Sequence, residues 1–159
     1  MPKLFTKSLS RSLDPKGRLM LPSEYREALA TDNDAGSFWL TGQNGCLVAY
    51  LPHNWEEITE QLNRIPLPSQ NLFYFKTKFI GLGQELTPDA QGRVRIPQSL
   101  MREAGLQKDV MLVGMHSQFQ IWDQIRFDAL VPKDVSAELA AAGVNISLTE
   151  KERYGAGAD

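Results

Sequence analysis

The sequence predicts an α+β fold in which one β-β-α-β-β unit of about 45 residues occurs twice. The main observation is an internal repeat. Residues 14–22 read DPKGRLMLP and residues 89–97 read DAQGRVRIP, and both fit Asp-x-x-Gly-Arg-hydrophobic-x-hydrophobic-Pro. Two later blocks recur in the same order, because residues 38–42 match 110–114 and residues 46–50 match 118–122. Ordered blocks at a nearly constant offset indicate that the whole unit is duplicated.

The first half of the unit is predicted to be a pair of strands joined by a tight turn. Residues 7–13 alternate Leu9, Arg11 and Leu13 with serines, and this two-residue period is typical of a strand. Residues 14–17 have Asp, Pro and Gly at the positions that a type I turn favours. Residues 18–21 form the second predicted strand, which ends at Pro22.

The second half of the unit is predicted to be a short helix followed by a hairpin. The helix covers residues 23–29, and its twin covers residues 98–104 with Gly105 as the expected stop. Residues 37–41 and 46–51 are the hairpin strands, because Asn44-Gly45 between them is a strong turn signal. A unit this small buries too little surface to be stable alone. The two units are therefore expected to share a core, either within one chain or with units of neighbouring chains.

The segments outside the units are predicted to be mostly helical. A helix beginning near Pro52 places Trp55, Ile58 and Leu62 on one face, and the proline-rich residues 64–69 end it. The aromatic residues 71–79 fit a helix or a strand, and a helix is favoured; residues 133–142 predict a C-terminal helix. The expected organisation is repeat 1 at 8–54, a helix and linker at 55–82, repeat 2 at 83–126, a C-terminal helical segment at 127–148 and a mobile tail at 149–159.

Charge is unevenly distributed along the chain. The total is only −2, but residues 1–26, 27–75, 76–102 and 103–159 carry +4, −5, +3 and −4 in turn. Both positive segments contain a copy of the Asp-x-x-Gly-Arg motif. A local basic patch is sufficient for contact with nucleic-acid phosphates, since only the contacting surface has to be positive. Charge alone leaves two readings open: binding of DNA or RNA, and an ordinary solvated surface.

Several other classes of protein are excluded by composition and spacing. A single cysteine, Cys46, rules out an internal disulfide framework and fits a reducing compartment. No apolar run is long enough to cross a bilayer, and residues 1–13 lack the apolar core of a secretory signal. His53 and His116 have no partners at metal-ligand spacing, and no nucleophile–base set or cofactor fingerprint is found. We therefore expect no enzyme activity, no cofactor, no metal and no membrane partner.

The paired motifs, followed by VMLVG and FQIWD in the second copy, resemble the MraZ family of bacterial transcriptional regulators over roughly residues 5–148. This resemblance implies AbrB-like swapped-hairpin repeats that form a β-barrel with flanking helices. It also implies a cytoplasmic, nucleoid-associated, sequence-specific DNA-binding regulator, a repressor of its own division and cell-wall operon. The implied partners are double-stranded DNA with short direct repeats and further copies of the chain in a ring-like homo-oligomer. Two features depart from the family pattern. Lys7 replaces the glycine of a Phe-x-Gly near the N-terminus. The segment before the second repeat, where arginines are common, contains only the basic residues Lys76 and Lys78.

The candidate DNA contacts are basic residues of the two motif segments: Lys7, Arg11, Lys16, Arg18, Arg93 and Arg95. Arginine can bind phosphate or pair with guanine. Arg18 and Arg93 have an alternative role, because each can pair with the aspartate four residues earlier and brace the turn. These aspartates are Asp14 and Asp89, and the two roles are compatible. Gly17 and Gly92 are expected to serve the turn backbone.

The two copies are not equally basic. In the second copy, Arg95 occupies the position that Met20 has in the first copy. Three other basic residues, Lys7, Arg11 and Lys16, lie in the first copy or just before it. We therefore expect the first copy to make most of the DNA contacts. The rival interpretation is a non-catalytic assembly scaffold whose basic segments bind nucleic acid without sequence preference. Discrimination between specific and scrambled DNA separates these two interpretations.

Overall fold

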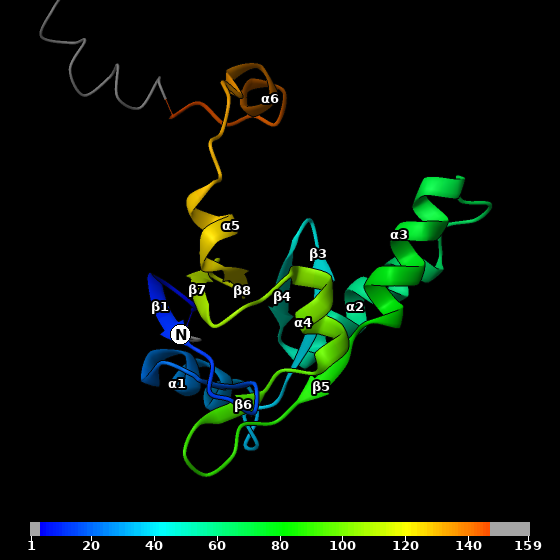
Figure 1. Cartoon of the computed structure of the whole chain (residues 1–159). Coiled ribbons are helices and arrows are strands. Elements are labelled where there is room, and N and C mark those ends of the chain that lie inside the picture. Colours follow the sequence, from blue (N-terminus) through cyan, green and yellow to red (C-terminus); the bar gives the residue numbers. More distant parts are fainter. Residues whose placement is uncertain (1–3, 147–159) are drawn as a thin grey trace, which may run out of the picture. The chain divides into compact units, whose positions relative to one another are not determined.

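The computed structural model describes residues 4–146 (Figure 1). The chain divides into two units, residues 1–128 and 129–159. The first unit contains both repeats. The described part of the second contains one short helix, α6 (Ser136–Ala141), within the region expected to be helical. The tail expected to be mobile, residues 149–159, lies outside the described residues.

The two repeats have the same order of elements. The first contains β1 (Ser8–Ser12), β2 (Arg18–Met20), α1 (Ser23–Asp32), β3 (Phe38–Gln43) and β4 (Cys46–Tyr50). The second contains β5 (Gln84–Leu86), β6 (Arg93–Arg95), α4 (Gln98–Ala104), β7 (Asp109–Gly114) and β8 (Gln118–Asp123), and α5 (Gln124–Asp128) follows directly. Duplication of the β-β-α-β-β order is therefore a property of the structure as well as of the sequence.

Two helices connect the repeats and extend to one side of the sheet in Figure 1: α2 (Pro52–Asn63) and α3 (Gln70–Gly81). The helix favoured for residues 71–79 is confirmed. It begins at a serine cap, since the Leu72 N–H donates to Ser69 Oγ at 3.2 Å. His53 lies at the start of α2, where its Nδ1 is 3.2 Å from Asp32 Oδ1, and His116 lies in the β7–β8 turn.

The strands of the two repeats pair with each other. The larger sheet has the order β1-β7-β8-β4-β3-β5, and all its neighbouring strands are antiparallel. The first strand of each repeat thus pairs with the hairpin of the other, β1 with β7 and β5 with β3. The sheet is therefore symmetric: strands at the same distance from its two ends are equivalent strands of the two repeats. β2 and β6 form a separate two-stranded sheet. Among residues 4–146 these strands form open sheets and no closed barrel, so the structure supports the α+β class and not the barrel.

The main core belongs to both repeats, as the small size of each unit predicts. Phe119 of β8 lies at its centre and is completely buried. The Phe119 ring centroid is 5.0 Å from that of Phe5, 4.9 Å from Tyr25 and 5.5 Å from Phe38. Leu19 and Val94, one from each motif strand, lie in the same core. Neither repeat therefore has a separate interior.

A second, smaller apolar cluster fixes α2 and α3 to the outer side of the sheet. The Trp55 ring stacks on Trp39 at a centroid distance of 5.2 Å and on Phe79 at 5.3 Å. Cys46 is buried in this cluster, and burial raises the pKa of its thiol to about 12. The thiol is therefore protonated and unreactive near neutral pH.

The departure at Lys7 has a backbone explanation. Lys7 has φ +69°, in the left-handed region that glycine adopts without steric cost. Its carbonyl oxygen accepts a hydrogen bond from Tyr25 Oη at 3.0 Å, which fixes this conformation against α1. Lys7 thus adopts the backbone conformation that suits the glycine found at this position in the family that the sequence resembles.

Candidate nucleic-acid interface

The two motif turns lie beside each other because their following strands pair. In the antiparallel β2–β6 sheet, Arg18 is opposite Arg95 and Met20 is opposite Arg93. The Leu21 N–H also donates to the Gly92 carbonyl at 3.0 Å, and the equivalent Ile96 N–H donates to Gly17 at 2.9 Å. We call the strands β2 and β6 together the ribbon. Each strand of the ribbon is therefore attached to the turn of the other repeat.

The ribbon has one buried face and one outward face. Leu19 and Val94, the middle residues of the two strands, are 0% and 2% exposed. Because side chains alternate along a strand, the flanking residues share the outward face: Arg18, Met20, Arg93 and Arg95. Three guanidinium groups and one methionine thus lie on a narrow two-stranded ribbon, an element of the size that the DNA major groove admits.

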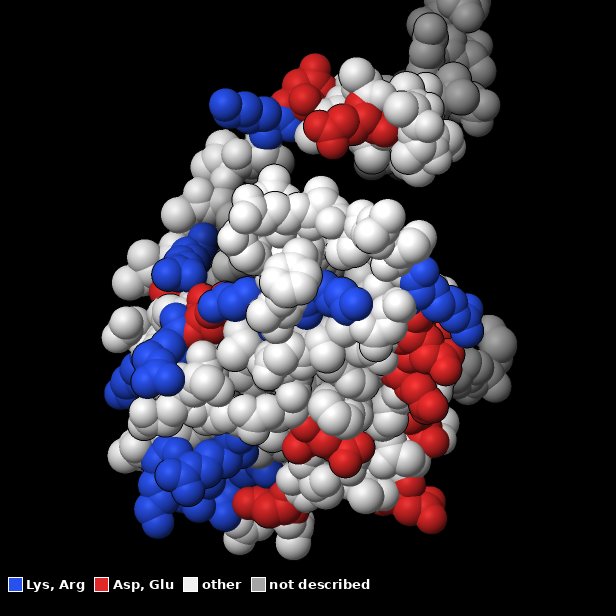
Figure 2. All heavy atoms as spheres, turned by 90° about the vertical axis from the view of Figure 1, so that its right-hand side faces the viewer, with Lys and Arg blue, Asp and Glu red and all other residues white. Residues whose placement is uncertain are grey.

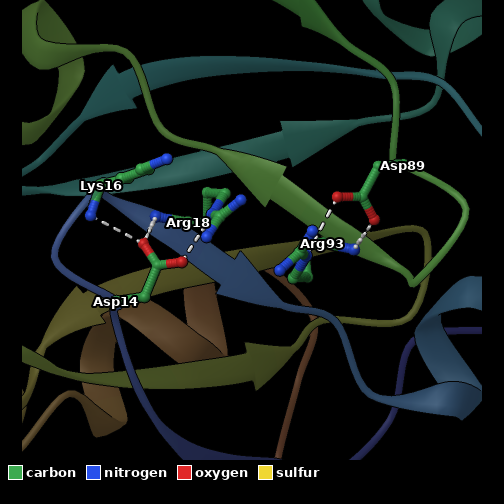
Figure 3. A network of polar contacts seen from close by, with 5 residues as sticks. All are labelled: Asp14, Lys16, Arg18, Asp89 and Arg93. Atoms are coloured by element: carbon green, nitrogen blue, oxygen red, sulfur yellow. Dashed lines mark hydrogen bonds and ion pairs between the residues drawn. The ribbon is translucent and has the colours of Figure 1, made fainter.

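Both turns are braced by the aspartate–arginine pair (Figure 3). The Arg18 Nε donates to Asp14 Oδ2 at 2.5 Å, and the Arg93 Nε donates to Asp89 Oδ2 at 3.0 Å. In each turn the other carboxylate oxygen accepts from the backbone N–H groups two and four residues later, at 2.8–2.9 Å. The backbone hydrogen bond from Arg18 is the main cause that holds the pKa of Asp14 below its ordinary value, and Arg93 does the same for Asp89.

This brace is compatible with DNA contact. Only the Nε of each arginine is bound to the aspartate, and within residues 4–146 neither Arg18 nor Arg93 forms a hydrogen bond from its terminal guanidinium nitrogens. The two side chains are 31% and 30% exposed, so each is partly accessible to solvent. The carboxylate thus orients a guanidinium that still has donors for an outside acceptor.

The glycines of the motif meet a backbone requirement. Gly17 has φ +76° and Gly92 has φ +81°, which a residue with a Cβ rarely adopts. Their N–H groups donate to the carbonyls of Asp14 and Asp89 at 2.9 Å and close the turns. Glycine is therefore needed here for the turn itself.

The remaining predicted residues lie at different distances from the ribbon. Arg11, on β1, is adjacent to it, because its Nε donates to the Met20 carbonyl at 3.2 Å. Lys16 is exposed in the first turn, and its side chain extends away from Asp14 (Figure 3). Lys7 has an acidic partner from α1, because its Nζ is 3.2 Å from Glu24 Oε1. The separation of 17 residues conceals this pair in the sequence.

Strand pairing brings basic residues of both copies together on the ribbon. Strand pairing places Arg95, from the second copy, beside Arg18 and close to the first turn. Sequence reasoning missed Arg26, which lies across Gly92 so closely that an added Cβ would be 2.5 Å from its Cδ. The equivalent neighbour of Gly17 is Met101, with Sδ 3.4 Å from such a Cβ. The alignment of the two repeats pairs Arg26 with Met101, and this difference was the only sign of Arg26 that the sequence offered.

Basic side chains are numerous on one face of the protein. In Figure 2, Lys and Arg side chains gather at the lower left of the view and also lie across its centre and at its right, where they meet Asp and Glu side chains. The acids of the two motifs are Asp14 and Asp89, and both are bound to arginines. The three arginines of the ribbon therefore outnumber the motif acids beside them.

Two further observations concern other kinds of site. Within residues 4–146, no group of three or more His, Cys, Asp or Glu side chains is arranged to hold a metal ion. No helix in this part of the chain is long and apolar enough to span a bilayer.

The chain is similar to a set of bacterial proteins named transcriptional regulator MraZ. One from Nitratidesulfovibrio vulgaris strain Hildenborough is 47% identical over 145 residues, which cover 89% of this chain and 97% of that protein. One from Oleidesulfovibrio alaskensis is 43% identical over 141 residues, covering 87% and 95%. One from Ligilactobacillus salivarius is 35% identical over 127 residues, covering 79% and 85%. These names describe regulators of transcription, in agreement with the expectation that the chain is not an enzyme.

The family comparison agrees with the internal repeat. The sequence model of the MraZ protein, which its description likens to antitoxins, matches residues 4–72 and again residues 79–145. Each match contains one motif turn and one strand of the ribbon. The duplicated sequence, the paired motif strands and the relatives thus lead to one identification: this chain belongs to the MraZ family.

Proposed function

We propose that this protein is a sequence-specific DNA-binding regulator of transcription that contacts double-stranded DNA through the outward face of the ribbon. The observation that carries the proposal is the group Arg18, Arg93 and Arg95, held on one exposed face by strand pairing and by two aspartate braces. A guanidinium can bind guanine O6 and N7 in the major groove or a phosphate oxygen. The names of the relatives support regulation of transcription as the purpose of this contact.

The finer parts of the proposal come from the family resemblance. The protein acts as a repressor of its own division and cell-wall operon, in the cytoplasm and associated with the nucleoid. Its repeats are of the AbrB-like swapped-hairpin type, and the exchange of β1 and β5 between the repeats supports this. Short direct repeats in the DNA suit a ring of subunits, because a second site bound by the same ring has a high effective concentration.

A footprint on the DNA upstream of the gene tests specific binding. We expect protection at short repeated elements and an affinity that falls steeply with added salt, since arginine–phosphate contacts release counterions. A scrambled duplex of the same length and composition is the matched control. Equal affinity for both duplexes would instead support the rival function, an assembly scaffold that binds nucleic acid without sequence preference.

Self-association is supported by an exposed aromatic surface on α3. Phe73 and Tyr74 are each 55% exposed and Phe75 is 40% exposed. Neighbouring large apolar side chains on the surface of a water-soluble domain often mark an interface. Phe75 stacks on the buried Phe79 of its own chain, whereas the rings of Phe73 and Tyr74 lie against each other on the surface. We propose that Phe73 and Tyr74 contact a second copy of the chain.

Replacing Phe73 and Tyr74 with serine is expected to lower the molar mass of the assembly measured by light scattering. The reason is that the substitutions remove apolar area from the proposed interface but not from the core of the subunit. Ile125→Ser is the control, because Ile125 is 75% exposed on α5. An unchanged mass for the α3 variant, or dissociation of the Ile125 variant alone, would show that α3 is not the interface.

A further inference from the structure

A groove of about 830 Å³ opens beside the first motif turn. One wall is the turn itself, the second is the segment that joins β6 to α4, and the third is the loop before β7. The Leu13 N–H donates to the Lys108 carbonyl at 2.8 Å, so this loop is attached to the chain just before the turn. The groove is thus lined by three segments that are fixed to one another by backbone hydrogen bonds.

Three cations line the groove: Lys16 of the turn, Arg95 at the end of β6, and Lys108 of the loop before β7. The only acidic residue that lines it is Asp14, whose carboxylate is bound to Arg18. The lining also contains apolar groups, among them Ile96 and Met101. The groove therefore combines positive charge with apolar surface, which suits a chain of phosphates linked by sugars.

The second turn lacks these cations. The residues equivalent to Lys16 and Arg95 are Gln91 and Met20, and the block alignment pairs Lys108 with Gly36. Arg26 adds a basic side chain there, which lies against Gly92. In the first turn the smaller, uncharged Met101 occupies that position. Of these four paired positions, the first turn thus has a cation at three and the second turn at one.

We propose that this groove holds the sugar-phosphate backbone of one strand of the DNA whose bases face the ribbon. This inference rests on the proposed DNA-binding function and adds a positioning contact to it. Contacts to phosphate fix the register of a protein on the duplex, whereas contacts to bases specify the sequence. The ribbon reads the bases, and the groove fixes the ribbon's orientation by holding the backbone on the side of the first turn only. Lys108 is a DNA contact that lies outside both motif segments.

The slope of log affinity against log salt concentration tests the groove. Lys16→Gln and Lys108→Gln are each expected to make this slope less steep. The expected change is about 0.9 per bound subunit for each phosphate that the lysine no longer neutralises. Lys76→Gln on α3 is the matched control, because it removes the same charge and no residue around Lys76 lines the groove. Lys16 and Lys108 are exposed and Lys76 is half-buried. Thermal melting checks that each variant is folded.

Met101→Arg separates a groove from a merely positive surface. The added side chain is expected to cover Gly17 as Arg26 covers Gly92, and therefore to weaken DNA binding although it adds a positive charge. Tighter binding of this variant, together with unchanged slopes for Lys16→Gln and Lys108→Gln, would overturn the proposal. If Met101→Arg fails to fold, the two lysine variants decide.

The test also separates this inference from the proposed function. If the unaltered protein prefers its upstream DNA but the lysine variants show the same salt dependence of affinity, the groove does not hold the DNA backbone, while the proposed DNA-binding function is retained. If the unaltered protein shows no preference, the function itself fails. A calorimetric titration with adenosine monophosphate provides the last arm: saturable binding that disappears in Lys108→Gln, with an unchanged DNA salt slope, would assign the groove to a small phosphate compound instead.

Discussion

Replacing Arg18, Arg93 and Arg95 together with glutamine is expected to weaken specific DNA binding at least about 100-fold, since one good arginine–guanine pair contributes about 1–3 kcal/mol. The expected effect is large because all three guanidinium groups lie on the outward face of one ribbon. The pairs with Asp14 and Asp89 are only partly exposed and brace the turns, so thermal melting checks that the triple variant is folded. Fluorescence anisotropy with a labelled upstream duplex measures the affinity.

The control for this triple variant removes the same charge elsewhere. Arg64→Gln, Lys76→Gln and Lys78→Gln change three cations at the end of α2 and on α3. We expect this variant to retain most of the specific affinity, provided that light scattering shows an unchanged assembly. An equal loss of affinity in both triple variants would mean that net charge alone governs binding, and would refute a specific role of the ribbon.

Replacing Phe119 with alanine is expected to lower the free energy of unfolding by about 3–5 kcal/mol, the usual cost of removing a buried phenylalanine ring. Phe119 is completely buried and its ring contacts Phe5, Tyr25 and Phe38. Three of these four residues lie in or before the first repeat, while Phe119 belongs to the second. The cavity would therefore weaken the packing between the repeats and not only one of them.

Urea unfolding at neutral pH measures this effect, with Phe73→Ala as the comparison. Phe73 is 55% exposed on α3 and should cost far less in subunit stability. We expect a single transition for both proteins, because a shared core makes the repeats unfold together. Two transitions in the unaltered first unit, or a cost below about 1 kcal/mol for Phe119→Ala, would contradict a core shared between the repeats.

The elements could be predicted from the sequence because they depend on local signals. The alternation around Leu9 and Arg11 indicated β1, and the Asp-Pro-x-Gly order indicated the first turn. Helix α1 extends three residues beyond its predicted end at residue 29, since no glycine or proline ends it there. The strand β5 has the residues Gln84 and Glu85 on an exposed edge, where no apolar alternation marks it.

The pairing of the elements could not be predicted, because it joins residues far apart in the chain. A three-residue strand such as β2 carries no signal for its partner, yet its pairing with β6 creates the arginine face. The four-residue spacing from Asp14 to Arg18 indicated the brace as one of two options, and the structure contains it. The contacts of Lys7 with Glu24, Arg26 with Gly92, and Lys108 with the first turn depend on packing, so each became visible only in the folded chain.

The ribbon as the DNA-contacting surface is tested most directly by DNA cleavage from a single tethered iron chelate. Met20→Cys places a thiol on the outward face of the ribbon, at a position that is 41% exposed. Cys46 is 3% exposed and its pKa is about 12, so it should stay unlabelled. Leu67→Cys in the loop between α2 and α3 provides the matched control, because Leu67 is 98% exposed. We predict that the chelate at position 20 cuts the upstream duplex only within the protected elements, and that the chelate at position 67 does not. Cleavage from position 67 alone, or equal cleavage of scrambled DNA from position 20, would contradict the ribbon as the specific DNA contact.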